Sequence, residues 1–214
     1  MKTVAIIPIK GNSKRIKNKN IKKIYGKPLY RYLLDKISKC NFDSIYIDTD
    51  INQIKYYAKK NKINIIDRKP ILTKDSANGN DLLTYHAKII KADFYFQIFV
   101  TSPLLSITSI NNCIRILKKD KKVDSIFTAK KIYSWFWFKN KPVNYKPKVL
   151  PRSQDAEPII METTGLYGIK KNSLKKNNCR IGKKPFIYFL KDHKETLDID
   201  TNDDLKMFKF LLKK

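Results

Sequence analysis

A continuous apolar run that opens directly into a basic Gly/Ser loop is the feature that most constrains this chain. Residues 4–9 read Val-Ala-Ile-Ile-Pro-Ile, and residues 10–15 follow as Lys-Gly-Asn-Ser-Lys-Arg. An apolar run without alternation is typical of a central strand in a parallel sheet, because both of its faces are buried. Backbone N–H groups of a Gly/Ser loop can form a nest for an anion, and Lys10, Lys14 and Arg15 add positive charge. The sequence therefore predicts an α/β sheet whose carboxyl edge holds a phosphate.

The loop matches neither of the two commonest nucleotide-binding patterns. It contains no G-x-x-x-x-G-K-[ST] and no G-x-G-x-x-G. A plain basic surface loop before a helix is therefore the alternative to a phosphate site.

Strand and helix patterns alternate along most of the chain. This order predicts a single domain over residues 1–214, with an α/β fold in which a mostly parallel sheet lies between two helical layers, a three-layer α/β/α sandwich. We expect strands over 4–9, 44–50, 63–67, 94–100, 124–129, 164–169 and 184–190, and helices over 29–39, 53–61, 81–91, 109–119 and 203–212.

The segment 132–160 departs from this alternation. Aromatic side chains crowd residues 133–138, and four prolines punctuate the stretch that follows. We interpret the segment as an excursion from the main sheet. Its aromatic cluster could stack nucleic-acid bases, but such clusters more often belong to a core or a subunit contact.

Charge and cysteine content restrict the function classes. The formal net charge is +27, which suggests a nucleic-acid partner, yet the lysines are spread along the whole chain rather than gathered in one segment. We favour a solvated basic surface that attracts anionic substrates over a nucleic-acid-binding surface. The three cysteines lie far apart, so we expect free thiols and a cytoplasmic location. No apolar run is long enough to predict a membrane span, and the N-terminus does not resemble a signal peptide.

Four separated segments carry a resemblance to a known family. Residues 8–20 resemble its nucleotide loop, and Arg-Lys-Pro-Ile-Leu followed by Lys-Asp-Ser-Ala over 68–77 resembles its R-P-x-x-L…D-[ST]-A segment. Residues 100–104 resemble the end of its Q-P-T-S-P-L-R motif, and residues 198–205 resemble its D-I-D-T-x-x-D-L close. In this order and spacing, the four segments resemble the acylneuraminate cytidylyltransferase family.

The resemblance implies a Rossmann-like nucleotidyltransferase sheet and an enzyme that uses CTP with Mg²⁺. The anomeric hydroxyl of a nonulosonic, sialic-acid-like sugar acid would attack the α-phosphorus of CTP, and pyrophosphate would leave. An octulosonate or another 3-deoxy-2-keto sugar acid is the alternative acceptor. A catalytically impaired nucleotide-binding relative and a basic RNA-binding module are the rival functions. The resemblance also implies that the excursion serves as a homodimer contact.

The same resemblance assigns roles to individual residues. It implies catalytic roles for Lys10, Lys19 and Asp200, and metal binding by Asp198 and Asp200. It implies nucleotide binding by Gly11, Asn12, Ser13, Lys14, Asn20, Arg68, Asp75 and Ser76. It implies acceptor binding by Phe99, Thr101, Ser102, Arg152, Gln154 and Thr164, with Arg152 pairing with the acceptor's carboxylate.

Simpler interpretations exist for several of these residues. Asp200 or Thr201 could simply cap the last helix, and such a cap is compatible with metal binding by the Asp200 carboxylate. Arg68 could be a solvated cation at a strand end. The two histidines, His86 and His193, lack a second ligand at useful spacing, so we expect structural roles, with His193 possible at the border of the site.

Three positions depart from the family pattern. Lys10 and Leu105 stand where arginine is usual, and Phe99 stands where glutamine is usual. Lysine keeps the charge of arginine but loses its bidentate fork. Phe99 replaces two polar functions with an apolar face, so we expect an acceptor that is less polar than N-acetylneuraminate or differently substituted.

Overall fold

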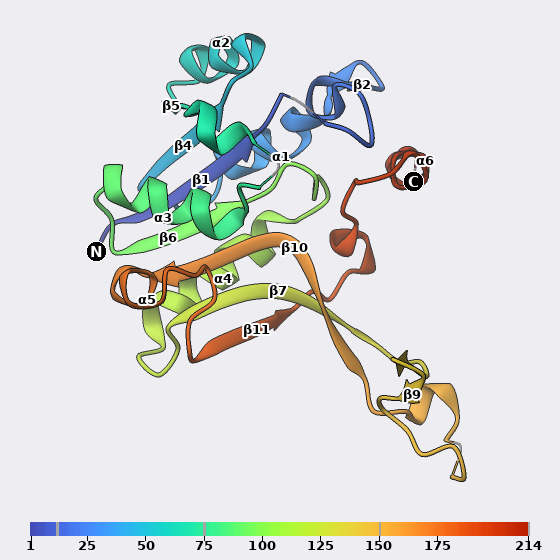
Figure 1. Cartoon of the computed structure of the whole chain (residues 1–214). Helices are drawn as coiled ribbons and strands as arrows, with labels where there is room; N and C mark the ends of the chain where they lie inside the picture. Colours follow the sequence, from blue (N-terminus) through green and yellow to red (C-terminus); the bar gives the residue numbers. More distant parts are fainter. Residues whose placement is uncertain (12, 75, 150, 214) are drawn as a thin grey trace.

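The computed structural model describes residues 1–11, 13–74, 76–149 and 151–213, and a seven-stranded sheet forms its centre (Figure 1). The strand order is β11-β7-β10-β6-β1-β4-β5. β10 is antiparallel to its neighbours β6 and β7, while the other pairings in the sheet are parallel. The strands of this sheet are β1 (Thr3–Ile9), β4 (Ser44–Thr49), β5 (Asn64–Asp67), β6 (Phe94–Ile98), β7 (Ser125–Ile132), β10 (Ile159–Lys170) and β11 (Pro185–Phe189).

Helices cover both faces of the sheet, so the predicted three-layer α/β/α sandwich with a mostly parallel sheet is confirmed. α1, α2 and α4 pack against one face, and α3 and α5 pack against the other. The helices are α1 (Leu29–Ile37), α2 (Asn52–Lys60), α3 (Gly79–Ile89), α4 (Ile107–Lys119), α5 (Lys171–Asn177) and α6 (Asn202–Leu212). Short 3₁₀ turns span Lys19–Ile21, Pro70–Thr73, Ser153–Asp155 and His193–Thr196.

The apolar run of β1 explains its central place. Every residue of the strand is buried. Successive side chains point to opposite faces, so Val4 and Ile6 join the core beneath α3, while Ala5, Ile7 and Ile9 join the core beneath α1 and α4. Because β1 is a central strand buried on both faces, the basic Gly/Ser loop that follows it begins at the carboxyl edge of the sheet.

α6 returns to cover the loop region near the start of the chain. Leu205 and Phe208 of α6 pack with Ile16, Ile24 and Leu29 in one buried cluster. Ile24 belongs to a small hairpin formed by β2 (Lys23–Ile24) and β3 (Lys27–Pro28). The cluster therefore holds the two ends of the chain together beside the carboxyl edge of β1.

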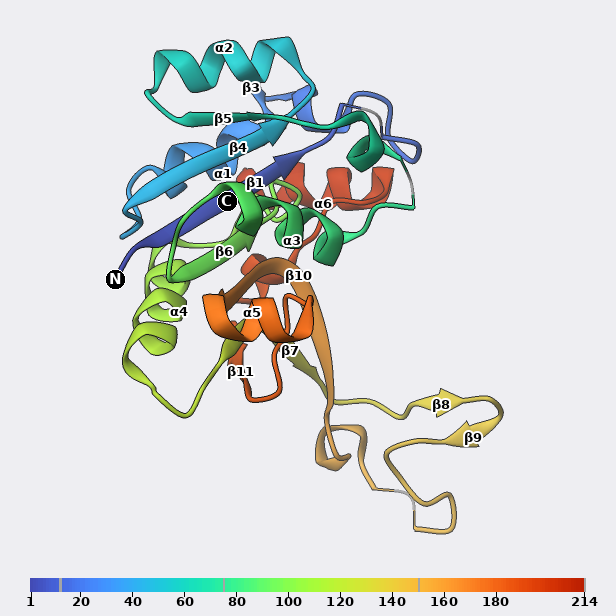
Figure 2. The same cartoon turned by 60° about the vertical axis from the view of Figure 1, so that its left-hand side comes forward.

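The segment between β7 and β10 forms an arm that projects away from the sandwich (Figures 1 and 2). It contains a second hairpin, β8 (Trp137–Phe138) and β9 (Lys141–Pro142). Asn144 organises its base, since its side-chain amide donates to the carbonyls of Ser134 and Glu157 and accepts from the N–H of Phe136. Trp137 and Phe138 are 58% and 67% exposed. The aromatic cluster is therefore outside the core of the described chain.

Two local features differ from the sequence prediction. α5 was not predicted, because only Leu174 of its seven residues is buried and the segment shows no apolar periodicity. β10 is longer than predicted and extends into the arm, with a register shift between Glu162 and Tyr167. Thr164 lies inside this irregular stretch with a φ of 54°. Within the described residues, no helix has the length and apolar character needed to cross a membrane.

Candidate active site

A cavity of about 350 Å³ opens at the carboxyl edge of β1 and β6. Ligands in open α/β sheets bind at this edge. Its lining is strongly cationic, and no carboxylate belongs to it among the described residues. The lining residues are Pro8, Lys10, Ser13, Lys14, Arg15, Lys19, Asn20, Arg68, Leu72, Lys74, Ala77, Leu82, Phe99, Val100 and Thr101. We call this cavity the carboxyl-edge pocket.

The loop after β1 supplies one wall of the pocket. Asn20 fixes the loop, because its side-chain amide donates to the Lys10 carbonyl at 2.8 Å. The Gly11 N–H donates to Asp50 Oδ1 at 2.7 Å and Gly11 does not line the pocket, so the structure gives the Gly11 N–H a partner other than a phosphate. Asn12 and Asp75, both predicted to bind the nucleotide, lie outside the described residues.

Lys19 connects this loop to the end of the chain. Its Nζ donates to the Ile199 carbonyl at 2.6 Å and lies 2.9 Å from Asp200 Oδ1. Arg15 Nη2 lies 2.8 Å from the same carboxylate oxygen. The Ile199 N–H in turn donates to the carbonyl of Thr101, which lines the pocket. The structure thus brings Lys19, Asp200 and Thr101 together as predicted.

The turn before α6 positions Asp200. The carboxylate of Asp204 accepts from the backbone N–H groups of Asp200 and Thr201 at 2.9 and 2.7 Å. The Thr201 hydroxyl accepts from the Asp204 N–H, which completes a capping box. Burial would raise the pKa of Asp204, but these hydrogen bonds lower it below its ordinary value. Thr201 and Asp204 therefore cap α6. The Asp200 carboxylate takes no part in the cap and pairs with Arg15 and Lys19.

Asp198 has different partners from Asp200. Its Oδ2 accepts from the Thr164 hydroxyl at 2.6 Å, and its Oδ1 is buried without a hydrogen-bond partner. Asp198 lines a neighbouring hollow that it shares with His193, not the carboxyl-edge pocket. An unpartnered carboxylate oxygen fits a hard cation such as Mg²⁺. No group of three His, Cys, Asp or Glu side chains is close enough to hold a metal ion within the described ranges.

A buried charge network fixes Arg68 at the pocket wall. Arg68 Nε lies 3.0 Å from Asp48 Oδ1, and the Arg68 side chain is only 2% exposed. His86 Nε2 lies 2.9 Å from the other oxygen of Asp48, and both side chains are fully buried. Burial would raise the pKa of Asp48, but hydrogen bonds with His86 and Arg68 hold it below its ordinary value. Arg68 is therefore not a solvated cation, and His86 has the structural role that the sequence predicted.

The predicted acceptor residues are divided between two places. Phe99 and Thr101 line the pocket, whereas Ser102 is buried and does not line it. Ser76, which was predicted to bind the nucleotide, is exposed and does not line it either. Arg152 and Gln154 lie in the projecting arm (Figure 2), where Arg152 is 76% exposed and pairs with Asp155 at 2.6 Å. Within the chain, these two residues are not brought to the pocket, and their acceptor role stays a prediction.

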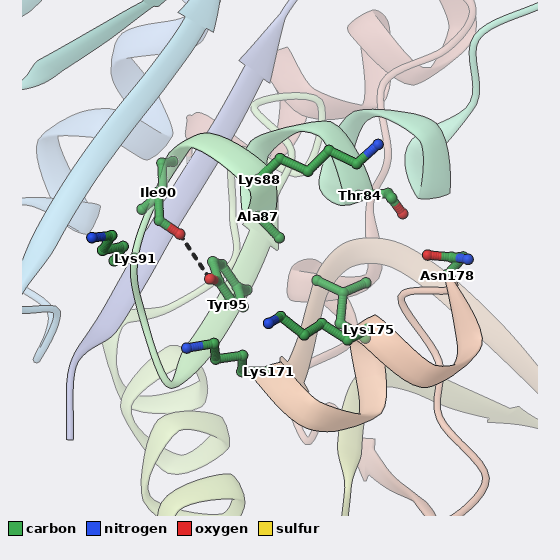
Figure 3. A pocket seen from close by; sticks show the side chains of 10 residues that line it. Thr84, Ala87, Lys88, Ile90, Lys91, Tyr95, Lys171, Lys175 and Asn178 are labelled. Carbon is green, nitrogen blue, oxygen red and sulfur yellow. Dashed lines mark hydrogen bonds between the residues drawn. The ribbon is translucent and has the colours of Figure 1, made fainter.

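A larger hollow of about 550 Å³ lies elsewhere, between α3 and α5 (Figure 3). Its rim carries Lys88, Lys91, Lys171 and Lys175, and Tyr95 forms part of its floor. None of the residues predicted for the site line it. We place the site in the smaller carboxyl-edge pocket, because the sequence-predicted cations converge there at the ligand edge of the sheet.

Fold and pocket together define an α/β protein with a cationic pocket at the carboxyl edge of a mostly parallel sheet. The chain belongs to the cytidylyltransferase family, whose model matches residues 4–213. The resemblance carried by the four sequence segments is thereby confirmed.

Individual relatives agree with this assignment. The chain is 25% identical over 206 residues to N-acylneuraminate cytidylyltransferase A of Danio rerio, which covers 92% of this chain and 48% of the relative. It is 26% identical over 185 residues to the pseudaminic acid cytidylyltransferase and UDP-2,4-diacetamido-2,4,6-trideoxy-beta-L-altropyranose hydrolase of Helicobacter pylori, covering 82% of this chain and 36% of the relative. The chain thus spans at most about half the length of these curated relatives.

The fold also resembles that of solved structures. A CMP:2-keto-3-deoxy-manno-octonic acid synthetase complexed with CTP superposes with a TM-score of 0.73 at 16% identity, covering 100% of this chain and 99% of that one. A 4-diphosphocytidyl-2C-methyl-D-erythritol synthase from Anaerococcus prevotii gives 0.71 at 13% identity, covering 100% and 97%. At these identities, the likeness establishes the fold.

The Asp48 network generates a stability prediction. Asp48→Asn leaves the buried Arg68 cation without its counter-charge, so we expect the free energy of unfolding at pH 7 to fall by roughly 3–5 kcal/mol in urea titrations. Asp67→Asn is the control, because Asp67 is 81% exposed in its ion pair with Lys55, and this variant should change stability by less than about 1 kcal/mol.

The same network predicts an acid dependence. The pKa of Asp48 is depressed in the folded state, so its contribution is complete above the unfolded pKa of about 4 and is lost as the pH falls further. Below about pH 4, wild-type stability should drop more steeply than that of Asp48→Asn. Equal stability of Asp48→Asn and Asp67→Asn at pH 7 would contradict a buried, charged Asp48.

Proposed function

We propose that this chain is a CTP-dependent cytidylyltransferase that transfers CMP to the anomeric hydroxyl of a nonulosonic sugar acid and releases pyrophosphate. The observation that carries the proposal is the cationic carboxyl-edge pocket in a chain of the cytidylyltransferase family. Relatives named for acylneuraminate and pseudaminic acid favour this acceptor class. An octulosonate is the second candidate, since a 3-deoxy-manno-octulosonate cytidylyltransferase of Francisella tularensis is 30% identical over 118 residues, or 52% of this chain.

The pocket's charge suits the triphosphate of CTP. Phosphoryl transfer needs positioned groups that neutralise charge on the phosphates more than it needs covalent chemistry. We assign Lys10, Lys14 and Arg15 to the phosphates, with Ser13 as a hydrogen-bond donor from the same loop. Lys10 provides a point charge but no planar fork of N–H donors. We therefore assign bidentate phosphate contacts to Arg15.

The remaining walls suit the nucleoside and the acceptor. Arg68 is held rigid by Asp48, so it can present its unused N–H groups to the base or ribose at little entropic cost. Phe99 and Thr101 lie at the end of β6 and line the same pocket. We therefore assign the Phe99 side of the pocket to the acceptor.

We propose Mg²⁺ as the cofactor, with Asp198 and Asp200 as its protein ligands. The buried, unpartnered Oδ1 of Asp198 supports this assignment. When bound, the ion would add charge neutralisation at the phosphates. Arg15 and Lys19 already compensate Asp200, so this residue also holds the loop cations in place.

Two wider proposals accompany the enzyme. The exposed aromatic side chains of the arm favour a homodimer contact there. All three cysteines are free thiols, which favours a reducing, cytoplasmic location.

Pyrophosphate release tests the proposed reaction. Wild-type protein should release pyrophosphate only when CTP, Mg²⁺ and a sugar acid are all present, in a panel that contains N-acetylneuraminate, pseudaminic acid and an octulosonate. Asp198→Asn removes one ligand charge and should lower turnover at limiting Mg²⁺ by at least about tenfold. Asp203→Asn is the matched control, since this carboxylate of the same segment is 87% exposed and pairs with Lys206 at the surface.

Other outcomes would favour the rivals. Absence of pyrophosphate release with intact CTP binding would point to a catalytically impaired relative. RNA binding that excess CTP does not displace would favour an RNA-binding module. An Asp198→Asn variant as active as Asp203→Asn would remove Asp198 from the metal site.

The arm generates a prediction about association. Light scattering at micromolar concentration should give twice the mass of the chain, because a homodimer would cover the exposed Trp137 and Phe138. The double variant Trp137→Ser, Phe138→Ser should shift the mass to that of one chain. Tyr56→Ser is the control, because Tyr56 is an aromatic side chain on α2 that is 72% exposed. A wild-type monomer would contradict the dimer.

A further inference from the structure

We infer that Arg180 binds the carboxylate of the acceptor and so completes the acceptor side of the site. This inference rests on the proposed function, because it takes the acceptor to be a sugar acid. The sequence had assigned the carboxylate to Arg152, which lies in the arm. Arg180 was not among the predicted site residues.

Arg180 lies directly beside the pocket wall. Its guanidinium carbon is 3.6 Å from the centre of the Tyr167 ring and 5.9 Å from the centre of the Phe99 ring. The two rings meet edge to face, with their centres 6.4 Å apart. Phe99 lines the carboxyl-edge pocket, so Arg180 places positive charge at the border of that pocket.

Three contacts, two from α3 and one from β10, hold Arg180 in this position. Its backbone N–H donates to the side chain of Asn80 at 2.9 Å. A Cβ atom on Gly79 would lie 2.4 Å from Arg180 Nη1, so the guanidinium rests against the start of α3 at a position that only glycine leaves open. The Tyr167 ring beneath it is buried. The guanidinium is therefore pre-positioned rather than a freely moving surface cation.

Within the part of the chain that the structure describes, the Arg180 guanidinium forms no salt bridge. Among the described residues, no carboxylate lies within ion-pair distance of it. Glu162 is the acidic residue next to Tyr167, but its carboxylate accepts from the Tyr167 hydroxyl at 2.6 Å and forms no ion pair with Arg180. Arg180 is only partly buried, so its guanidinium remains open to an anion from outside the described chain.

The geometry selects a carboxylate. Stacking on the Tyr167 ring uses the flat face of the guanidinium and leaves its edge, which carries the N–H donors, for another partner. Arginine has five N–H donors and no acceptor, and its fork matches the two oxygens of a carboxylate. Phe99 by itself would make this wall of the pocket apolar. Arg180 adds a cation that donates hydrogen bonds and accepts none.

This arrangement changes the expectation drawn from Phe99. The sequence suggested an acceptor less polar than N-acetylneuraminate, because phenylalanine replaces an amide. With Arg180 beside Phe99, this side of the pocket can still bind a polar group, provided that the group accepts hydrogen bonds. Discrimination should therefore depend on the acceptor's negative charge.

Steady-state pyrophosphate assays with four variants test the inference. Arg180→Gln removes the charge, Arg180→Lys keeps the charge but loses the fork, and Gly79→Ala displaces the guanidinium without altering it. Arg115→Gln, an exposed arginine on α4, is the control for charge loss. The acceptors are the sugar acid that the wild type uses best and its C1 carboxamide.

We expect Arg180→Gln to raise the acceptor KM by about 10- to 100-fold, the range typical of a hydrogen bond to a charged group. The KM for CTP and the calorimetric Kd for CTP should stay within about twofold. The carboxamide, which lacks the charge, should lose far less than the acid. Arg180→Lys and Gly79→Ala should give intermediate acceptor KM values, and they decide the question if thermal melting shows that Arg180→Gln is unfolded.

Two outcomes overturn the inference while the proposed function stands. One is that folded Arg180→Gln has the same acceptor KM as Arg115→Gln. If Arg180→Gln is unfolded, the same result in folded Arg180→Lys and Gly79→Ala counts equally. The other is an equal loss with the acid and with its carboxamide. If the wild type uses no sugar acid in the panel, the proposed acceptor class fails, and this inference fails with it.

Discussion

A single buried ammonium group, on Lys19, joins the two ends of this chain at the edge of the site. Lys19 is 7% exposed and bonds to the Ile199 carbonyl and the Asp200 carboxylate, 180 and 181 residues away. The Lys19 side chain is 8% exposed and that of Asp200 is 35% exposed, so removal of Asp200 would leave the Lys19 ammonium largely buried without its counter-charge. The contacts of Lys19 with Ile199 and Asp200 link the loop after β1 to the turn before α6. The bond from the Ile199 N–H to the Thr101 carbonyl links that turn to the segment after β6.

A second buried charge network does the same on the far side of the pocket. Asp48 lies on β4, Arg68 follows β5 and His86 belongs to α3, so three elements meet at one carboxylate. Rigid positioning before the substrate arrives is what lets a cationic site act on a phosphate without reorganising. The two networks hold Arg15, Lys19 and Arg68, three of the pocket's cations, and the described lining of the pocket contains no carboxylate.

The sequence predicted the sandwich because its signals are local. The run over 4–9 is buried on both faces, and the amphipathic helices around Leu33 and Ile114 each present one apolar face to the sheet. The cations of the first loop were also predictable, since they follow a central strand. α5 carried no such signal, because one buried leucine does not make a periodic pattern.

Contacts between distant residues could not be predicted in the same way. Nothing in the residues around Asp48 indicates that its partners lie 20 and 38 positions further on. Arg180 is a similar case, because its ring partners are Tyr167 on β10 and Phe99 directly after β6, and these two strands become neighbours only in the folded sheet. Arg152 was favoured instead by its place in the family pattern, and the fold puts it in the arm.

The most direct test of a nucleotide site in the carboxyl-edge pocket is a calorimetric titration with CTP. Lys14 lines the pocket, whereas Lys17 belongs to the same loop, is exposed and does not line it. Loss of a charge-assisted contact to phosphate should weaken CTP binding to Lys14→Ala by roughly tenfold, while Lys17→Ala stays within about twofold of the wild type. Equal affinities for the two variants, or no CTP binding by the wild type, would contradict a triphosphate site in this pocket.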